Sequence, residues 1–232
     1  MAQEIGEKIL RPGEVLDDLQ LDNLKIIQNR SLYCFTSDSV LLANFVKVGA
    51  KDVILELCSG CGVVSILVKA KCNPKKIFGI EIDKELHDMS VRSLAYNYIK
   101  DVEFVCDDAK NVLGHFKKQS FDVVFSNPPY FVKNKDDKIN LKYLNAKYET
   151  KIDLEGIFKS ADEMLKFGGK FFVCFTPTRV QELLAVGDKH KFVLKKMQFV
   201  YPKNKDKLST LVLCCFVKNG NRDCEVVCPK YV

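Results

Sequence analysis

From residue 52 onward, short apolar runs alternate with longer stretches that have helical spacing. The apolar runs are DVILELC, KKIFGIEI, VEFVC and FDVVFSN, and their β-branched and aromatic residues favour strands. The stretches VVSILVKAK and KELHDMSVRSLAYNYIK lie between them, and Asp83 is the expected N-cap of the second. This alternation predicts βαβ units, and therefore an α/β fold with helices on both faces of a mostly parallel sheet.

The regular alternation stops after the fourth run. Residues 131–150 are polar, basic and aromatic, and they are too long for an ordinary connection, so we expect a lid or a binding loop. A helix through LEGIFKSADEMLK is then expected to stop at Gly168 and Gly169, before a strand KFFVCFT and a helix near RVQELLAV. The runs VLKKMQFVYP and STLVLCCFVKNG predict an antiparallel C-terminal hairpin. The whole pattern predicts a Rossmann-like sheet of seven strands.

Residues 1–51 are less regular and predict a small N-terminal appendage packed on the main sheet. LKIIQN and LYCF are expected to form two short strands around Arg30 and Ser31, and Ser37 is expected to cap a helix through DSVLLANFV. The main domain then spans residues 52–220, and residues 221–232 form a C-terminal tail.

The composition is that of a globular domain. The chain has 232 residues, of which 47% are hydrophobic and 28% charged. No apolar run approaches the roughly 20 residues that a membrane-spanning helix needs. The N-terminus also lacks the apolar core of a signal peptide, so we expect a cytoplasmic protein without a membrane partner. A monomer is compatible with the sequence, which leaves the oligomeric state open.

The ten cysteines are expected to be mostly free thiols, because they accompany a full-sized core and no export signal. Cys58 and Cys61 form a CxxC pair, but the three histidines are not at ligand spacing, so no metal is expected. Four cysteines lie inside apolar runs and are expected to be buried as small hydrophobic side chains: Cys106, Cys174, Cys214 and Cys215.

The ends of the first three predicted strands carry residues that suit a nucleoside-type ligand. After Glu56 the chain passes through Gly60 and Gly62 directly into a helix, as in loops that approach a ligand closely, although glycines there can also simply make a turn. Glu81 ends the second strand, where a carboxylate can accept hydrogen bonds from both ribose hydroxyls. A nicotinamide dinucleotide is the second choice, because Ser65 stands where that pattern needs Gly or Ala.

The third strand ends in Cys106-Asp107-Asp108-Ala109. The Asp108 carboxylate can accept a hydrogen bond from an adenine amino group, or it can cap the helix that follows. Because parallel strands end at one edge of the sheet, these residues are expected to line one pocket.

The fourth strand ends in Asn127-Pro128-Pro129-Tyr130. A planar nitrogen, as in adenine or an amide, is a poor nucleophile because its lone pair is delocalised. The side-chain oxygen of Asn127 and the carbonyl of Pro128 can accept its two N–H groups and turn the lone pair toward an electrophile. The two prolines stiffen the loop, and Tyr130 offers a ring for stacking. An asparagine before proline is also common in plain turns.

With these residues, the chain resembles the class I Rossmann-like methyltransferases that carry an NPPY-type loop, across residues of about 30 to 220. Within them it is similar to the bacterial tRNA (adenine-N6) methyltransferases that modify valine tRNA at the adenine after the anticodon. The supporting stretches are LDDLQLDNLKIIQN, FTSDSVLLANF, AKYE and LKFGGKFF.

The resemblance implies S-adenosyl-L-methionine as the cofactor and Asn127 to Tyr130 as the catalytic loop. Cys58 stands where many of these enzymes have the first glycine of G-x-G-x-G. The implied cofactor-binding residues are Glu56, Gly60 and Gly62 at the methionine end, Glu81 at the ribose, Asp108 with Ala109 at the adenine, Asn127 of the catalytic loop, and Thr36 and Asp38 closing over the cofactor.

The expected partner is tRNA. The formal net charge is +6, and residues 133–147 and 189–207 hold five and seven lysines beside Tyr143 and Tyr201, which suit phosphates and bases. Either stretch can also be a solvated surface. The alternatives are methylation of a glutamine amide in a release factor, N6-adenine methylation of rRNA or DNA, and a nucleic-acid-binding module without catalysis.

Overall fold

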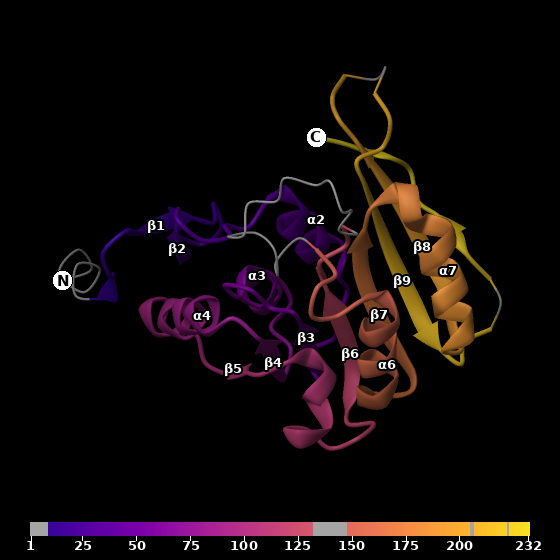
Figure 1. Ribbon diagram of the computed structural model, residues 1–232, viewed down its shortest axis with the longest axis horizontal. Coiled ribbons are helices and arrows are strands. Elements are labelled where there is room, and N and C mark those ends of the chain that lie inside the picture. Colours follow the sequence, from indigo (N-terminus) through magenta and orange to yellow (C-terminus); the bar gives the residue numbers. More distant parts are fainter. Residues whose placement is uncertain (1–8, 132–147, 205–206, 222) are drawn as a thin grey trace.

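The computed structural model describes residues 9–131, 148–204, 207–221 and 223–232. The predicted strands form one sheet in the order β8-β9-β7-β6-β3-β4-β5 (Figure 1). Only β9 runs antiparallel to its neighbours among these seven, so the predicted fold class is confirmed. The strands are β3 (Val53–Leu57), β4 (Lys76–Glu81), β5 (Val102–Cys106), β6 (Phe121–Ser126), β7 (Leu165–Phe175), β8 (Phe192–Tyr201) and β9 (Leu211–Lys218).

Helices cover both faces of this sheet (Figure 1). Successive strand residues point to opposite faces, so Ile54 packs into one apolar cluster and Leu55 into the other. One face carries α2 (Ser37–Phe45), α3 (Val63–Cys72) and α4 (Lys84–Tyr96). The other carries α6 (Leu154–Met164), α7 (Val180–Lys189) and the 3-10 segment η1 (Ala109–Gly114), and a second such segment, η3 (Pro177–Arg179), precedes α7.

The helix boundaries differ in part from the prediction. Asp83 is the N-cap of α4, as expected, and its side chain accepts from the Glu85 and Leu86 amides at 2.9 and 3.2 Å. The predicted cap Ser37 is wrong, because Thr36 occupies the N-cap position of α2 and makes no side-chain capping bond.

The predicted stop of α6 at two glycines is also wrong. The helix ends at Met164, because the buried ammonium group of Lys218 donates to the Leu165 carbonyl at 3.2 Å and to the Asp162 carbonyl. Gly168, with φ of +73°, lies inside β7 instead. The cap comes from a distant strand, so the local sequence carried no sign of it.

The N-terminal segment forms a two-stranded sheet of β1 (Glu14–Asp18) and β2 (Lys25–Asn29). The predicted second strand in LYCF is wrong, because β1 precedes β2 rather than following it. Residues 32–35 are irregular, and Leu32, Tyr33 and Phe35 line a cavity at the edge of the main sheet.

The C-terminal tail extends the main sheet. Its two short strands, β10 (Glu225–Val226) and β11 (Lys230–Tyr231), pair in parallel with the outer edge of β8. The stretch 132–147, to which most of the predicted lid or binding loop belongs, lies outside the described residues.

The ten cysteines are thiols and form no disulfide. Three of the four that were expected to be buried are so, but Cys106 is exposed because it ends β5, the edge strand of the sheet. Across the described ranges, no helix is long and apolar enough to cross a membrane.

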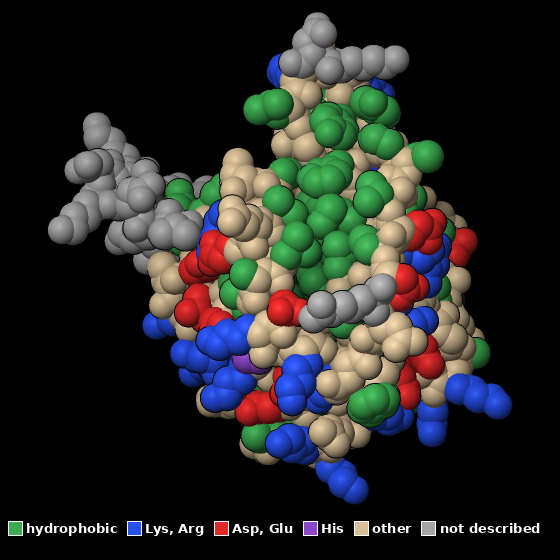
Figure 2. Space-filling model, turned by 90° about the vertical axis from the view of Figure 1, so that its right-hand side faces the viewer, with side chains coloured by type: hydrophobic (Ala, Val, Ile, Leu, Met, Phe, Trp, Pro, Cys, Tyr) green, Lys and Arg blue, Asp and Glu red, His purple; other side chains and the backbone are tan. Residues whose placement is uncertain are grey.

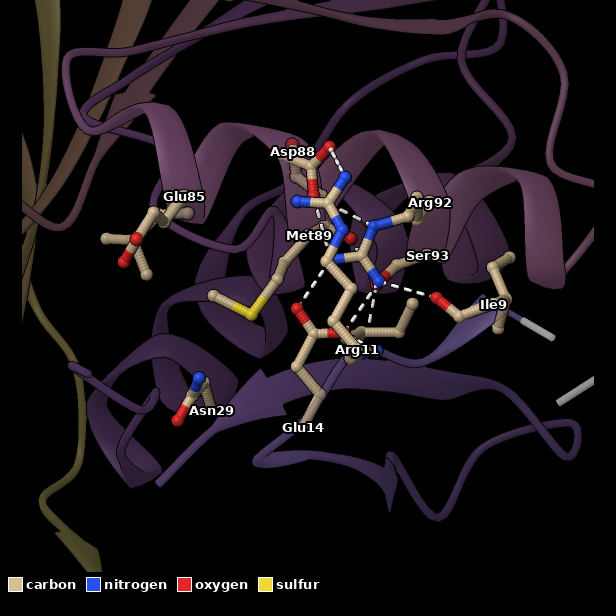
Figure 3. A network of polar contacts seen from close by, with 12 residues as sticks. Ile9, Arg11, Glu14, Asn29, Glu85, Asp88, Met89, Arg92 and Ser93 are labelled. Atoms are coloured by element: carbon tan, nitrogen blue, oxygen red, sulfur yellow. Dashed lines mark hydrogen bonds and ion pairs between the residues drawn. The ribbon is translucent and has the colours of Figure 1, made fainter. Parts of the chain in front are cut away.

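A polar network fastens the N-terminal hairpin to α4 (Figure 3). The Arg92 guanidinium donates two hydrogen bonds to the Glu14 carboxylate at 2.6 and 2.7 Å, and it also donates to Asp88 and to the Ile9 carbonyl. The side chains of Arg92 and Glu14 are only 16% and 6% exposed. Such a bidentate, mostly dehydrated pair is far stronger than a surface ion pair.

We therefore expect Arg92→Leu to destabilise the protein by about 3 kcal/mol at pH 7, because it leaves the Glu14 carboxylate mostly buried with only the Arg11 amide as a donor and without its paired cation. Urea unfolding measures the effect. Arg30→Gln, which breaks an exposed ion pair with Asp17 on the same hairpin, should cost less than about 1 kcal/mol. Equal losses in the two variants would contradict this account of the network.

Candidate functional site

The candidate site lies where the order of the strands reverses. β3 pairs with β4 on one side and with β6 on the other, so its carboxyl end opens a crevice between the two halves of the sheet. A cavity of about 290 Å³ lies there. Seven of the residues proposed from the sequence line it: Glu56, Gly60, Glu81, Asp108, Ala109, Asn127 and Pro129.

The loop after β3 has an alternating backbone conformation. Cys58, Gly60 and Gly62 all have positive φ, at 56°, 55° and 82°. A left-handed residue at every second position explains why a G-x-G-x-G pattern suits such a loop. Cys58 meets the same requirement with a side chain, at the cost of backbone strain.

The two glycines serve different purposes. A Cβ atom on Gly60 would meet nothing within 4 Å, so the backbone there borders open space in the cavity. A Cβ atom on Gly62 would lie 2.6 Å from the Phe104 ring. Gly62 is therefore required by packing, and it does not line the cavity.

Glu81 holds the glycine loop in place. Its carboxylate accepts from the Gly60 amide at 2.7 Å and from the Asp83 amide at 2.9 Å. Burial raises the pKa of this carboxyl group, and the two amide bonds oppose the rise. Each oxygen keeps a further lone pair, so Glu81 can still accept from a ligand.

Glu56 is the most deeply buried acid of the cavity, with 1% of its surface exposed. Burial raises its pKa to about 8, although the amide and hydroxyl of Ser65 both donate to its Oε2. A carboxylate in this setting is poorly stabilised by its surroundings, and a cationic group bound beside it would stabilise the ionised form.

The wall of the cavity also holds a polar atom without a partner. The Ser59 hydroxyl is buried and makes no hydrogen bond to any described residue. Buried polar atoms in native proteins are normally satisfied, often by a ligand or by water. Asp108 lines the same wall, but it also accepts from the Lys110 amide at 2.9 Å, so it caps η1 as the alternative interpretation expected. These donors and acceptors fit a ligand that carries both ribose and amino-acid groups.

Asn127 lies at the end of β6, with both ends of its side-chain amide in hydrogen bonds. Nδ2 donates to the Ser39 hydroxyl at 3.0 Å, and Oδ1 accepts from the Cys174 thiol at 2.9 Å. These contacts fix the orientation of the amide, and Oδ1 keeps one lone pair for a further donor. Nothing in the sequence indicated that Ser39 or Cys174 would act on Asn127.

The rest of the loop is tied to two other elements. The Tyr130 hydroxyl donates to Asp38 at 2.9 Å, and burial, followed by the charge of Asp38, raises its pKa. Arg179 donates to the Tyr130 carbonyl at 2.8 Å and pairs with Glu149 at 2.9 Å. Glu149, the last residue of the AKYE stretch, is thus linked to the loop through Arg179.

Four further predicted residues do not line the cavity: Thr36, Asp38, Pro128 and Tyr130. Asp38, which was expected to close over the cofactor, contacts Tyr130 instead. Tyr33, Phe35, Ser39 and Lys151 also line the cavity, although none was predicted as a site residue. Phe35 and Ser39 belong to the FTSDSVLLANF stretch, whereas no sequence signal pointed to Tyr33 or Lys151.

The second lysine-rich stretch is partly neutralised. Lys195 forms an ion pair with Asp223, and Lys196 pairs with Glu225 at 2.8 Å. The part of the chain that the structure describes contains no group of three or more His, Cys, Asp or Glu side chains that could hold a metal ion.

Solved structures share this fold. A predicted O-methyltransferase from Agrobacterium tumefaciens superimposes with a TM-score of 0.66 at 19% identity, over 84% of this chain and 86% of that one. TYW2 from M. jannaschii, in complex with AdoMet, gives a TM-score of 0.60 at 11% identity, over 90% and 88% of the two chains.

Two relatives extend the comparison to the sequence. The chain is 33% identical over 132 residues to a candidate protein N5-glutamine methyltransferase of Methanocaldococcus jannaschii, covering 56% of this chain and 63% of that protein. It is 26% identical over 168 residues to the tRNA1(Val) (adenine(37)-N6)-methyltransferase of Bacteroides thetaiotaomicron, covering 71% and 69%. The chain thus spans less than two thirds of the first relative's length.

The fold, with its cavity at the strand reversal, is the one that these methyltransferase structures have, and the family match that follows confirms the predicted class and its cofactor, S-adenosyl-L-methionine. A family model for the methyltransferase small domain matches residues 35–200. The chain belongs to this methyltransferase small domain family.

Glu56→Gln should stabilise the cofactor-free protein at alkaline pH. The folded pKa of about 8 exceeds the ordinary value of 4.5, so the wild type loses stability as the pH rises from 4.5 to 8. Each pKa unit corresponds to about 1.4 kcal/mol, so the variant should gain a few kcal/mol by pH 8. Thermal melts from pH 5 to 9 measure this. Glu103→Gln, on the exposed edge strand, is the control, and a pH-independent difference for Glu56→Gln would refute the buried-carboxylate account.

Ser39→Ala should lower kcat by about tenfold, because Asn127 loses one of the two bonds that orient it. A methyl-transfer assay stopped at fixed times gives kcat. Calorimetry gives the affinity for the cofactor, which should change by less than about threefold. Ser37→Ala removes an exposed hydroxyl from the same helical turn, whose contact with Asp38 Oδ1 is long at 3.5 Å, and it should change neither quantity. If Ser39→Ala weakened only cofactor binding, its role in orienting Asn127 would be disproved.

Proposed function

We propose that this protein transfers a methyl group from S-adenosyl-L-methionine to the exocyclic N6 nitrogen of an adenine in tRNA, the adenine that follows the anticodon. The observation that carries the proposal is the Asn127 side chain, which lines the cavity and is held in one orientation by Ser39 and Cys174. An amine whose lone pair is delocalised needs a hydrogen-bond acceptor that is held in a fixed position beside the cofactor.

The target amine would be held by two acceptors. Oδ1 of Asn127 has one free lone pair for an N–H group, and the Pro128 carbonyl accepts the other N–H group. The bound cofactor supplies an electrophilic methyl group on a sulfonium centre. With both protons held, the nitrogen lone pair turns toward that methyl group, so the residues act by positioning and by favourable dipoles. The excess proton leaves to water after transfer.

Three acids would bind the cofactor. Glu56 would pair with the ammonium group of the methionine part, which explains how a carboxylate with a raised pKa becomes ionised. Glu81 would accept from the ribose hydroxyls through the lone pairs that Gly60 and Asp83 leave free. Asp108 would accept from the adenine amino group. Thr36 and Asp38 would act indirectly, through α2 and Tyr130.

Two considerations favour tRNA over a protein substrate. Several relatives are tRNA1(Val) (adenine(37)-N6)-methyltransferases, and the net charge of +6 suits a polyanion. An adenine in a tRNA loop is also readily unstacked, and tRNA would be encountered by an enzyme of the cytoplasm. The glutamine amide of a release factor is the second candidate, supported by the relative that is 33% identical.

Methyl transfer from labelled S-adenosyl-L-methionine to tRNA, rRNA, DNA and release factor, each unmodified, distinguishes the candidates. We expect label in tRNA, recovered as N6-methyladenosine by nucleoside mass spectrometry. Asn127→Ala should lower kcat for tRNA by about 10² to 10³ while keeping cofactor affinity. Label in the release factor alone, or full tRNA activity in Asn127→Ala, would refute the proposal.

A further inference from the structure

The tail places an aromatic side chain beside the end of β8. Tyr231 pairs with Tyr201 across β11 and β8, and the two ring centroids lie 5.8 Å apart. Val232 and the backbone of Lys203 close the pairing with a hydrogen bond of 2.9 Å. The tail therefore adds the side chains of Tyr231 and Val232 to the surface beside the carboxyl end of β8.

This end of β8 and the candidate site both lie at the carboxyl ends of strands. β8 and β6 run in the same direction, because β7 is parallel to β6 and β9 is antiparallel to both β7 and β8. The two strands are three places apart in the sheet, and the twist of the sheet turns their ends away from each other. The surface at the end of β8 is therefore separate from the cavity.

The surface is unusually apolar for an exposed edge. Figure 2, which views the molecule from the side of β8, shows apolar side chains gathered in a hollow below the turn between β8 and β9. Leu208 in that turn is 88% exposed, and Tyr231 is 49% exposed. Large exposed apolar patches usually mark a site of interaction.

The charges beside this surface are positive. Among the described residues of 198–210 and 226–232, the charged side chains are Lys203, Lys207 and Lys230. The acids of the tail are held at the other end of β8, where they pair with Lys195 and Lys196.

Lys230 also belongs to a cluster of like charges. The pKa of Lys71 is lowered, first by its burial and then by the neighbouring charges of Lys47 and Lys230. Mutual repulsion of this kind is relieved when a polyanion binds nearby.

We infer that Lys230, Tyr231 and Val232 of the C-terminal tail, together with Lys203, Lys207 and Leu208 after β8, form a binding surface for single-stranded RNA outside the cavity that would hold the target base. Tyr231 and Leu208 offer faces for unpaired bases, and Lys203, Lys207 and Lys230 contact phosphates. This inference rests on the proposed function, since it assigns the surface to the same RNA substrate. A protein partner would need acids on its own face to match these lysines, so RNA is the occupant that the charges favour.

The test compares two double variants of the full-length protein. Lys203→Gln/Lys230→Gln should lower the salt dependence of tRNA binding, d log K/d log[salt], by about 1.4, since each single-strand phosphate contact contributes about 0.7. Lys117→Gln/Lys118→Gln removes the same charge from exposed positions in the connection before β6, at the opposite edge of the sheet, and should leave the slope unchanged. Tyr231→Ala should raise KM for tRNA at least about fivefold, while Tyr231→Phe should not. Cofactor affinity should stay constant in all of them, and the melting temperature should fall only in Tyr231→Ala, which loses the ring contact with Tyr201.

The outcomes separate this inference from the proposed function. If the wild type methylates tRNA and all variants behave like it, the surface does not bind RNA and the inference fails alone. If the wild type does not methylate tRNA, the proposed function fails first. If Tyr231→Ala instead impairs methylation of a release factor, the surface docks a protein and the inference is overturned.

Discussion

The site depends on two carboxylates that the fold buries at the ends of neighbouring parallel strands. Glu56 and Glu81 are 1% and 7% exposed, and neither has a cationic partner among the described residues. Glu81 draws the Gly60 amide toward β4 and so sets the course of the loop, whereas Glu56 binds the first turn of α3 through Ser65. Both acids keep acceptor capacity toward the cavity. A buried acid without a cation opposes folding, so the arrangement is understandable if a ligand supplies the positive charge.

The position of the loop of residues 127–130 also depends on contacts with the N-terminal segment. Gln28 of β2 accepts from the Phe35 amide at 2.9 Å, and β2 belongs to the hairpin that Arg92 fastens to α4. Residues after Phe35 form the first turn of α2, which contacts Asn127 through Ser39 and Tyr130 through Asp38. The N-terminal segment thus contacts both the cavity, through Tyr33, Phe35 and Ser39, and the loop of residues 127–130, through Ser39 and Asp38.

The sequence predicted most of the fold, because its strands and helices are local patterns. β3 to β9 follow apolar runs, and α4 begins at a recognisable Asp83 cap. The errors arose where a distant partner decides the structure. Lys218 from β9 ends α6, and β1 rather than LYCF pairs with β2.

In the candidate site, too, the residues set by local patterns could be predicted, and the contacts between distant residues could not. Strand-end residues such as Glu81 and Asn127 could be found from spacing and motif, because parallel strands end at one edge. The role of Gly62 could not, since only the packed structure brings Phe104 against it. Likewise, Ser39 and Cys174 are separated from Asn127 by 88 and 47 residues, and no local pattern links them.

The central claim is that the cofactor supplies the cation that Glu56 lacks. Calorimetric titration of the protein with S-adenosyl-L-methionine at pH 7, repeated in buffers of different ionisation enthalpy, counts the protons released on binding. In the cofactor-free protein, burial raises the pKa of Glu56 to about 8. Binding should therefore release between about half a proton and one proton per cofactor from the wild type, and none from Glu56→Gln. Binding by the wild type without proton release would contradict it.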